Sequence, residues 1–481
     1  MTIYIILLDM ISKIIGRKDE KNILGKLFNS KKAEFVAVCG RRRVGKTFLI
    51  KEYFENDLIF KTSGLAHSNM KYQLKAFYDD LLDAGLPKQD KTPSDWIEAF
   101  SLLRQFIRMS EHKRKVVFLD ELPWFDTPKS GFVAALEHFW NVWGSTQDDL
   151  LLVVCGSATS WMMDKLINNH GGLHNRLTCK IFLRQFSLSE CEELLQQKGF
   201  NASRYDMAVL YMVLGGIPYY LERLDAGMSL SQNIDELVFR KNGALYDEFS
   251  NLYASLFKNS DEYIKVVEAL STIRMGLSRK KIIEMTKLQS GNGLTTILKN
   301  LESCDFIRKY RHYEKGGKKI NKYQLTDFFT IFYFHFLHNK PTAKWERVIG
   351  TSDFFAWAGI TFELLVLSHI GRLKECLGIS GVQTDEYTWS CHDDERGAQI
   401  DLLIDRKDLT VNLCEIKFSM SEFTIDKDYE AVLRNKVAKF VEYTKHRKSV
   451  IPTFISTYGL NHNSHSGIIA KEIRLDEFFS R

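Results

Sequence analysis

Hydrophobic positions near the start of the 481-residue chain predict a strand, a loop and a helix in succession. The run at 35–38 is uninterrupted, as in a strand buried on both faces, and the segment 48–54 has helical character. Buried runs at 116–119 and 150–154 predict two further strands, and another strand-like run follows Arg176. We therefore expect an α/β fold built on a parallel sheet.

The loop between the first strand and its helix fits GxxxxGK[ST] in full. Gly40 and Gly45 let the backbone N–H groups converge on a phosphate, Lys46 reaches the β- and γ-phosphates, and Thr47 ligates Mg²⁺. The predicted nucleotide-binding residues of the loop are Gly40, Arg41, Arg42, Arg43, Val44, Gly45, Lys46 and Thr47. The three arginines either contact the nucleotide or a neighbouring domain, or form a solvated loop tip.

Polar residues follow the later strands at positions where they can complete this site. Asp120 would hold Mg²⁺ through water, and Glu121 would orient or deprotonate the attacking water, which predicts ATP hydrolysis rather than binding alone. Ser157 can sense the γ-phosphate, cap the next helix, or do both. Arg176 is either an arginine finger, in cis or in trans, or a surface arginine.

After about residue 250 the pattern predicts three helices followed by a hairpin, the order of a winged helix. The third helix carries Leu294, Ile297, Leu298 and Leu301 on one face. The hairpin, which turns at Gly316-Gly317, carries one acid and a basic group consisting of Arg308, Lys309, Arg311, Lys315, Lys318, Lys319 and Lys322. Such clustering favours contact with the DNA backbone. The alternative is a protein-docking module with a solvated wing.

The last third of the chain contains a second candidate metal site. The aromatic run 328–337 predicts a core helix, and a later apolar helix carries Glu363. Asp401 lies in one strand-like run, and Glu415 and Lys417 end the next, where residues two apart share a face. Two carboxylates can bind Mg²⁺, and the lysine can activate water for phosphodiester attack. This D…ExK pattern resembles the restriction-endonuclease-like fold, which either cleaves DNA or persists as a binding module. A surface carboxylate–lysine pair is the third interpretation.

Several motifs in order resemble the archaeal-type ATPases of the STAND branch of P-loop NTPases. The motifs are "GRKDEKNILGKLF", "GRRRVGKT", "FLDELPW", "CGSATSWM" and "LGGIPYYL". The resemblance implies a RecA/AAA-like sheet with a helical lid, and a switch rather than a rapid metabolic enzyme. It also implies that Gly216 and Pro218 lie near the nucleotide and report its state, and that Gly16 to Glu20 lie near the adenine. Where the family usually shows a Gly-Arg pair, this chain has Asn175-Arg176.

The resulting domain organisation has five parts. We expect a leader at 1–15, a P-loop NTPase core at 16–180, a helical lid at 181–250, a winged-helix domain at 251–340 and a restriction-endonuclease-like domain at 341–481.

Composition adds little beyond the compartment. The net charge of +6 permits an anionic partner without requiring one. The eight cysteines form no CxxC pair, which implies a reducing compartment. "CHDDERG" at 391–397 suggests a metal cluster, but a polar hairpin loop is the better interpretation. The apolar run in the leader is shorter than the roughly 20 residues of a membrane span and lacks signal-peptide features. We expect a cytoplasmic protein without a membrane partner.

The sequence thus predicts an ATP- and Mg²⁺-dependent switch coupled to DNA binding, with DNA cleavage left open. The alternatives are an oligomerising signalling scaffold and a DNA-binding regulator with an inert nuclease-like domain. The scaffold alternative is the one in which we expect the chain to form a homo-oligomer.

Overall fold

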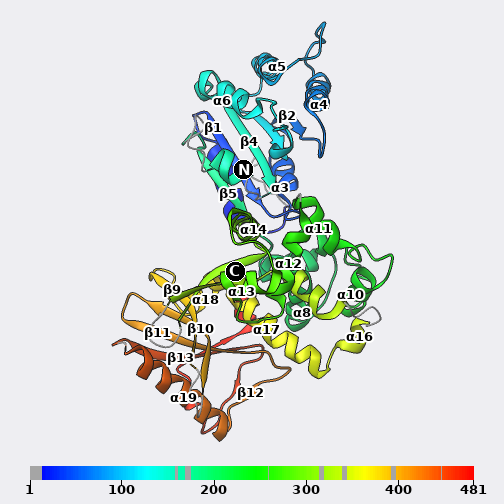
Figure 1. Cartoon of the computed structure of the whole chain (residues 1–481). Helices are drawn as coiled ribbons and strands as arrows, with labels where there is room; N and C mark the ends of the chain where they lie inside the picture. Colours follow the sequence, from blue (N-terminus) through cyan, green and yellow to red (C-terminus); the bar gives the residue numbers. More distant parts are fainter. Residues whose placement is uncertain are drawn as a thin grey trace, which may run out of the picture. The chain divides into compact units, whose positions relative to one another are not determined.

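The computed structural model describes residues 14–157, 161–167, 175–257, 259–313, 319–338, 344–391, 397–445 and 447–480. The chain forms two compact units, residues 1–185 and 186–481 (Figure 1). Most of the predicted leader, the hairpin tip with Lys315 and Lys318, and most of "CHDDERG" lie outside the described residues.

The first unit contains a five-stranded parallel sheet in the order β2-β3-β4-β1-β5. The strands are β1 (Glu34–Gly40), β2 (Leu58–Ser63), β3 (Lys115–Asp120), β4 (Leu150–Ser157) and β5 (Cys179–Leu183). Strands β1 and β4 are buried along their whole length, which explains why their apolar residues run without alternation. The strands predicted at 35–38, 116–119 and 150–154 are confirmed, and β2 is an addition.

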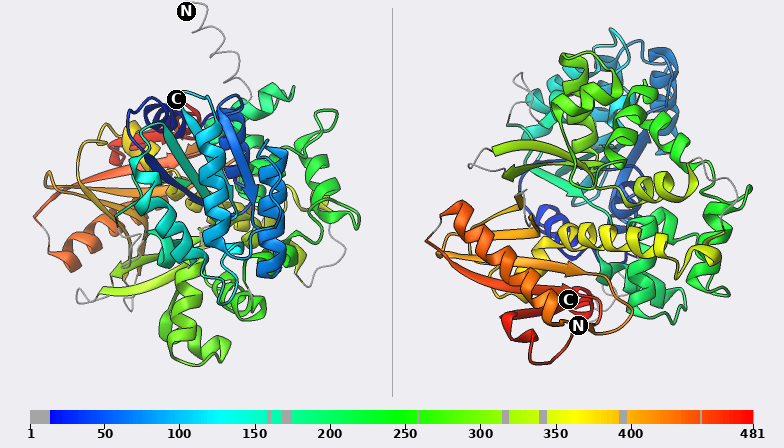
Figure 2. Two further views of the ribbon diagram at one scale, coloured as in Figure 1. Left: turned by 90° about the horizontal axis from the view of Figure 1, so that it is seen from above. Right: turned by 60° about the horizontal axis from the view of Figure 1, so that its bottom comes forward.

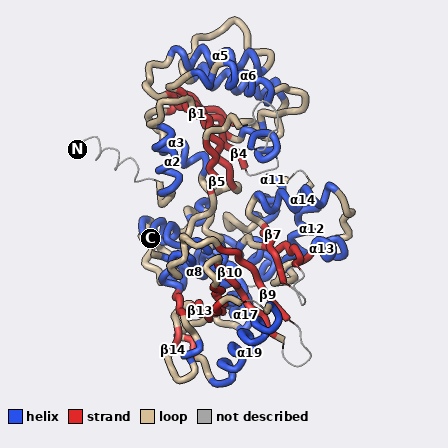
Figure 3. The backbone as a smooth tube through the Cα atoms, turned by 90° about the vertical axis from the view of Figure 1, so that its left-hand side faces the viewer, coloured by secondary structure: helices blue, strands red, loops and turns tan. Residues whose placement is uncertain are grey.

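Helices cover both faces of this sheet, as Figure 3 shows with α5 and α6 on one side and α2 and α3 on the other. The elements are α2 (Lys18–Phe28), α3 (Lys46–Tyr53), α4 (Met70–Asp83), α5 (Trp96–Met109), η2 (Leu122–Trp124), α6 (Phe132–Val142), η3 (Gly144–Thr146) and η4 (Met162–Ile167). Phe77, Trp96, Phe100 and Phe132 pack together between α4, α5 and α6 and cover β1 to β4. This aromatic core fixes the strands whose ends carry the predicted site.

The second unit begins with a helical region. Its elements are α7 (Leu188–Gln197), α8 (Arg204–Leu214), α9 (Pro218–Leu221), α10 (Leu230–Ile234), η5 (Asp235–Phe239) and α11 (Glu248–Leu256). Helix α8 is buried from Met207 to Leu214, so it forms the centre of this region. It ends at Gly215, whose φ of 73° is the left-handed conformation that glycine adopts readily.

Three helices and a hairpin follow, as predicted. They are α12 (Ser260–Ser271), β6 (Leu277–Ser278), α13 (Arg279–Thr286), α14 (Asn292–Ser303), β7 (Ile307–Tyr313) and β8 (Lys319–Leu325). Ser278 caps α13 by accepting from the Lys281 N–H. Leu294, Ile297, Leu298 and Leu301 of α14 are all buried, which confirms the predicted apolar face.

The hairpin does not stand apart, because β7 pairs with β9 in parallel, His312 opposite Thr388. One eight-stranded sheet therefore runs β15-β13-β11-β10-β9-β7-β8-β6. Its remaining strands are β9 (Thr384–Cys391), β10 (Ala398–Arg406), β11 (Thr410–Lys417), β13 (Ser449–Ser456) and β15 (Lys471–Arg474), while β12 (Phe423–Thr424) and β14 (Leu460–Asn461) pair separately. This continuity between the hairpin and the C-terminal strands was not predicted from the hydrophobic pattern.

The remaining helices are drawn in Figure 2. They are α15 (Phe328–Phe332), η7 (Tyr333–Leu337), α16 (Trp345–Val348), α17 (Ser352–Ser368), α18 (Ile370–Cys376), α19 (Lys427–Thr444), η8 (Ser466–Ile468) and α20 (Leu475–Phe479). Helices α15 and α16 pack on α8 and α10 of the helical region, whereas α17, α19 and α20 pack on the C-terminal strands. Phe440 of α19 packs on Trp389 of β9, and α17 contacts β11. Phe328, Phe329 and Phe332 are buried, as expected of a core helix.

Within the described ranges, no single helix is long and apolar enough to cross a membrane. Helices α17 and α18 meet that test of length and composition only as a pair, and the pair bends by 76°.

Candidate functional site

The phosphate-loop motif lies between β1 and α3, as predicted. Gly40 ends β1, and a Cβ there would come within 2.3 Å of the Leu183 carbonyl oxygen, so no side chain fits. Gly45 has a φ of 89° and directly precedes α3, whose first residue is Lys46. The loop therefore delivers backbone N–H groups and a helix N-terminus to one point, the arrangement that binds phosphate.

Thr47 and Asp120 come together from opposite sides of β4. The Thr47 hydroxyl donates to Asp120 Oδ2 over 2.8 Å, and the Lys46 ammonium donates to the Gly40 and Arg41 carbonyls at 3.2 and 3.0 Å. Asp120 ends β3, which is separated from β1 by β4. A hydroxyl and a carboxylate so close together, beside a phosphate loop, are the protein groups that hold Mg²⁺ on a bound nucleotide.

Glu121 stands in a strained backbone position next to Asp120. Its φ is 47°, which is left-handed and uncommon for this residue type. Burial raises the pKa of the Glu121 carboxyl above its ordinary value, while Lys46, Arg42 and the Ser157 backbone N–H lower it and Asp120 raises it further. Glu121 therefore lies close to Lys46 and to the Ser157 backbone N–H, beside the phosphate loop. This position and its raised pKa suit a general base.

Asp120 is oriented by Cys155, a residue to which the sequence motifs assign no role. The Cys155 thiol on β4 donates to Asp120 Oδ1 over 2.6 Å, and the Glu121 N–H donates to the same oxygen over 3.0 Å. Burial and the Asp120 carboxylate raise the pKa of Cys155 well above its ordinary value, so the thiol stays protonated and can donate. A neutral cysteine in a buried strand gives no chemical signal in sequence.

The three loop arginines differ in environment. Arg41 is buried, Arg43 is half-buried with a φ of 72°, and Arg42 is exposed. Only Arg42 therefore fits the solvated loop tip. Arg17, from the opening motif, is buried and donates to the Val44 carbonyl over 3.0 Å. This contact braces the phosphate loop from the start of α2, whereas its expected position near the adenine remains a prediction.

Other predicted residues lie at definite places in the fold. Ser157 ends β4 opposite Gly40, and Arg176 is exposed just before β5. Gly216 has a φ of 65°, and its carbonyl accepts from the Phe186 N–H at 2.8 Å. Pro218 begins α9, where a missing N–H costs nothing. The roles of these four residues toward the nucleotide remain predictions.

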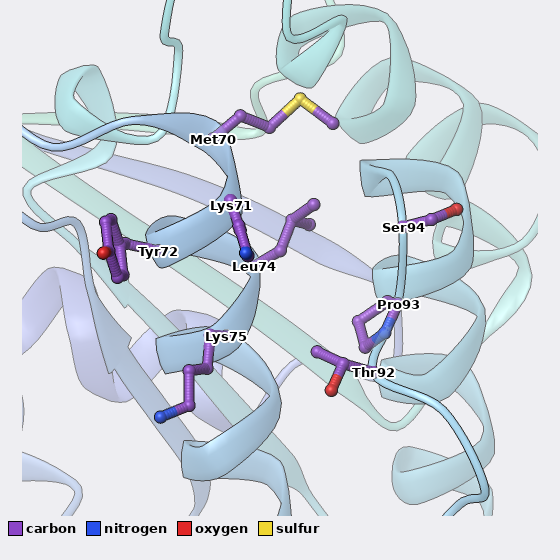
Figure 4. Close-up of a pocket in the computed structure, with 8 residues that line it drawn as sticks. All are labelled: Met70, Lys71, Tyr72, Leu74, Lys75, Thr92, Pro93 and Ser94. Atoms are coloured by element: carbon purple, nitrogen blue, oxygen red, sulfur yellow. The ribbon is translucent and has the colours of Figure 1, made fainter.

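A separate surface hollow of about 520 Å³ lies between α4 and the segment before α5 (Figure 4). Its lining residues are Met70, Lys71, Tyr72, Leu74, Lys75, Thr92, Pro93 and Ser94. None of them belongs to the predicted site.

The C-terminal residues Asp401, Glu415 and Lys417 are also brought together. Strands β10 and β11 pair antiparallel, and the Ile416 N–H donates to Asp401 Oδ2 over 3.2 Å. Lys417 Nζ lies 2.9 Å from Glu415 Oε1, which confirms that the two side chains share a face. The D…ExK residues thus form one cluster where Asp401, within β10, lies beside the end of β11.

Helix α19 adds two groups to this cluster that sequence reasoning missed. Tyr429 donates to Glu415 Oε1 and Lys436 to Glu415 Oε2, each at 2.6 Å. Burial alone would raise the pKa of Glu415, but Lys436 and Lys417 outweigh it and hold that pKa below its ordinary value. Burial and the Glu415 charge raise the pKa of Asp401. Glu363, on α17, reaches Asp401 only through Arg274, which contacts both carboxylates.

The basic hairpin residues split into two groups. Lys309 and Arg311 are exposed on β7, whereas Arg308 is half-buried, donates to Gln324 over 2.7 Å and lies over the Tyr310 ring. Burial lowers the pKa of Arg308 to about 10. Arg308 is therefore tied into the hairpin and is a poor candidate for phosphate contact, while Lys309 and Arg311 stay good candidates. Lys322 is half-buried on β8.

Neither candidate site is a cage of protein ligands. Among the described residues, no group of three or more His, Cys, Asp or Glu side chains is arranged to hold a metal ion. That is compatible with Mg²⁺ at Thr47 and Asp120, because nucleotide-bound Mg²⁺ takes most of its ligands from phosphates and water. At the C-terminal cluster, Arg274 contacts Glu363 and Asp401, and Lys417 and Lys436 contact Glu415.

Residues 14–224 match a protein family described as an ATPase domain predominantly from Archaea. An uncharacterized protein of Methanocaldococcus jannaschii is 22% identical over 440 residues, covering 90% of this chain and 94% of its own length. An uncharacterized ATP-binding protein of the same organism is 45% identical over 49 residues, 10% of this chain and 83% of its own. A Walker-type ATPase of Pyrococcus abyssi shares 15% identity over 68% of this chain and 97% of its own, with a TM-score of 0.48.

The family match agrees with the geometry of the first unit. It covers the phosphate loop, Asp120, Glu121 and the segment with Gly216 and Pro218. The matched part of the chain is similar to these ATPase domains, and the similarity supports ATP binding and hydrolysis.

Proposed function

We propose that the chain is a Mg²⁺-dependent ATP-hydrolysing switch whose second unit binds DNA and carries a restriction-endonuclease-like site. The observation that carries the first half is the hydrogen bond of 2.8 Å between Thr47 and Asp120, beside the lysine of the phosphate loop. Groups so arranged, in a domain of ATPase type, suit the metal and phosphates of ATP.

Each residue has a distinct role in this proposal. Lys46 and the loop N–H groups bind the phosphates, and Thr47 and Asp120 hold Mg²⁺, which neutralises phosphate charge when bound. Glu121 takes the proton of the attacking water, and its raised pKa makes it a stronger base. Ser157 senses the γ-phosphate, Arg176 acts as a finger, and Gly216 and Pro218 report the nucleotide state. The roles of Ser157 and Arg176 rest on their places at the end of β4 and before β5, and only the role of Gly216 and Pro218 rests on the resemblance to STAND ATPases.

An ATPase assay with and without duplex DNA tests the switch. We expect phosphate release that requires Mg²⁺, is lost in Lys46→Ala, and changes when DNA is added. Turnover that survives in Lys46→Ala would place hydrolysis outside the phosphate loop. Turnover indifferent to DNA would separate the ATPase from the proposed DNA function.

DNA binding is proposed for the winged-helix arrangement of α12, α13, α14 and the hairpin. The exposed Lys309 and Arg311 support it. Replacing both with alanine should weaken duplex binding about equally for all sequences and reduce the slope of log affinity against log salt by roughly one per lost phosphate contact. The double variant Arg240→Ala/Lys241→Ala removes two exposed cations elsewhere in the unit and should leave the slope unchanged.

Cleavage is proposed for Asp401, Glu415 and Lys417. Nicking of supercoiled plasmid with Mn²⁺ should be lost in Lys417→Ala and kept in Lys407→Ala, whose lysine is exposed and lies near Asp385 at 3.7 Å. Equal nicking by both variants would remove Lys417 from the proposed site.

The alternative is an ATP-dependent oligomerising scaffold or a DNA-binding regulator with an inert nuclease-like site. One observation favours inertness: Glu415, Asp401 and Glu363 each already contact a protein cation. ATP-dependent growth in mass by light scattering, without nicking or DNA binding, would select the scaffold.

A further inference from the structure

The turn between α12 and β6 carries Arg274, whose side chain contacts the C-terminal carboxylate cluster. One nitrogen of the Arg274 guanidinium, Nη2, contacts Glu363 Oε1 on α17 and lies 3.4 Å from Asp401 Oδ1 on β10. The Glu363 and Asp401 side chains are only 16% and 7% exposed, against 35% for Arg274. A cation from the three-helix region thus bridges two largely buried carboxylates of the C-terminal region.

The charges of the cluster balance only when Arg274 is counted. Its carboxylates are Glu363, Asp401 and Glu415, and its cations are Arg274, Lys417 and Lys436. Both lysines are in direct contact with Glu415, at 2.9 and 2.6 Å. Arg274 is therefore the cation in direct contact with the other two carboxylates, and without it the cluster carries one net negative charge. A buried negative charge of this kind favours a replacement cation.

The hairpin holds the turn that carries Arg274. The Arg274 carbonyl accepts from Gln324 Nε2 over 2.8 Å, and Gln324 Oε1 accepts from Arg308 over 2.7 Å. The Tyr310 hydroxyl donates to the next carbonyl, that of Met275. Gly276 closes the turn with a φ of 64°, where a Cβ would come within 2.3 Å of the Tyr323 carbonyl oxygen. Movement of β7 and β8 would consequently move Arg274.

We propose that Arg274 is an internal cation that closes the Glu363–Asp401 pair, so that a divalent metal binds there only in competition with it. In the closed arrangement Arg274 contacts both carboxylates, and in the open arrangement it has left them. The hairpin, which holds the turn that carries Arg274, determines how often each arrangement occurs. The guanidinium and the metal use the same carboxylate oxygens, so each weakens the other's binding reciprocally. This inference rests on the proposed nuclease-like site and adds its regulation.

Mn²⁺ binding to the full chain without nucleotide tests the competition, with free Mn²⁺ measured by electron paramagnetic resonance. Arg274→Ala should bind Mn²⁺ roughly tenfold or more tightly than the unmodified chain, because the competing charge is gone. Gln324→Ala should give a smaller gain by loosening the turn. Arg240→Ala, which removes an exposed arginine paired with Glu236, should match the unmodified chain. Folded Arg274→Ala protein that binds Mn²⁺ no better than the unmodified chain would overturn the proposal.

A second measurement does not depend on the variant folding. In the unmodified chain, saturating Mn²⁺ should speed amide hydrogen exchange in residues 272–278, and Asp401→Ala should abolish that effect. Unchanged exchange under Mn²⁺ would also overturn the proposal.

The Asp401→Ala background separates this idea from the proposed function. If Asp401→Ala removes Mn²⁺ binding but Arg274→Ala does not strengthen it, the metal site stands and the competition fails. If the Mn²⁺ bound by Arg274→Ala is the same in Arg274→Ala/Asp401→Ala, the carboxylate site itself fails, and the competition with it.

Discussion

The phosphate-loop site and the C-terminal cluster both combine acids with a lysine, yet their charges are satisfied differently. In the first, Asp120 accepts from a hydroxyl, a thiol and a backbone N–H, and Lys46 donates to loop carbonyls. In the second, Glu415 is held by Lys417 and Lys436. The first arrangement suits a charged ligand, whereas the second is already neutral. A sequence motif predicts which acidic and basic side chains come together, but it does not predict whether their charges neutralise one another.

The largest expected effect is on the first site. Lys46→Ala should lower ATP turnover by at least about 100-fold, since the ammonium that stabilises phosphate charge is removed. Lys51→Ala, on the exposed side of α3, is the matched control. Phosphate release under saturating Mg²⁺·ATP is the measurement, and Mn²⁺ binding at the C-terminal cluster should not change. Loss of both together would mean that the two regions are not independent.

Glu121→Gln should keep ATP binding and lower hydrolysis by about 100-fold, because the amide cannot accept the proton of water. Calorimetry with Mg²⁺·ATP reports binding, and single-turnover phosphate release reports hydrolysis. Equal loss of both would give Glu121 a structural role, as its strained backbone allows.

Lys436→Met should lower the free energy of unfolding by about 3 kcal/mol, because it leaves the buried Glu415 with one cation fewer. The pKa of Glu415 is depressed in the folded state, so its stabilisation is present above its ordinary pKa and is lost as pH falls through the folded value. Urea unfolding should therefore show a difference between variant and unmodified chain that narrows in acid. Lys427→Met, on the exposed first turn of α19, should show no such difference.

The smallest expected effect is that of Arg42→Ala, which should shift the pH dependence of ATP hydrolysis. Arg42 lowers the raised pKa of Glu121, so its removal should move the acid limb of ATP hydrolysis to higher pH. Arg42→Lys keeps the charge and should restore the profile. An unshifted limb in Arg42→Ala would show that Arg42 does not act on Glu121.

The parts that could be predicted from sequence are those set by local pattern. Uninterrupted apolar runs identified β1, β3 and β4, and the spacing of the phosphate loop placed Lys46 and Thr47 at the head of α3. The strand-like runs predicted β10 and β11, and the pairing that the structure adds puts Asp401 beside Glu415. In each case the signal and the structure lie within a few residues of one another.

The parts that were missed depend on distant partners. Arg274 lies 89 positions from Glu363 and 127 from Asp401, and no periodicity links them. Lys436 is one of three lysines on α19, and the local sequence does not distinguish it from the other two. The packing of α19 on the sheet brings it to Glu415. The pairing of β7 with β9 is a backbone contact at a strand edge, and side-chain pattern does not encode which edge is covered.

That edge pairing bears on how the protein can be divided for study. A chain ended after residue 340 would retain the hairpin but lose β9. The backbone groups at the end of β7, at His312 and Tyr313, would lose their partners, and the His312 side chain, which is buried beside Thr388, would be exposed. Strand edges with unpaired backbone groups tend to pair with strands of other chains. Fragments cut there should self-associate, so the hairpin and the C-terminal strands are best kept in one polypeptide.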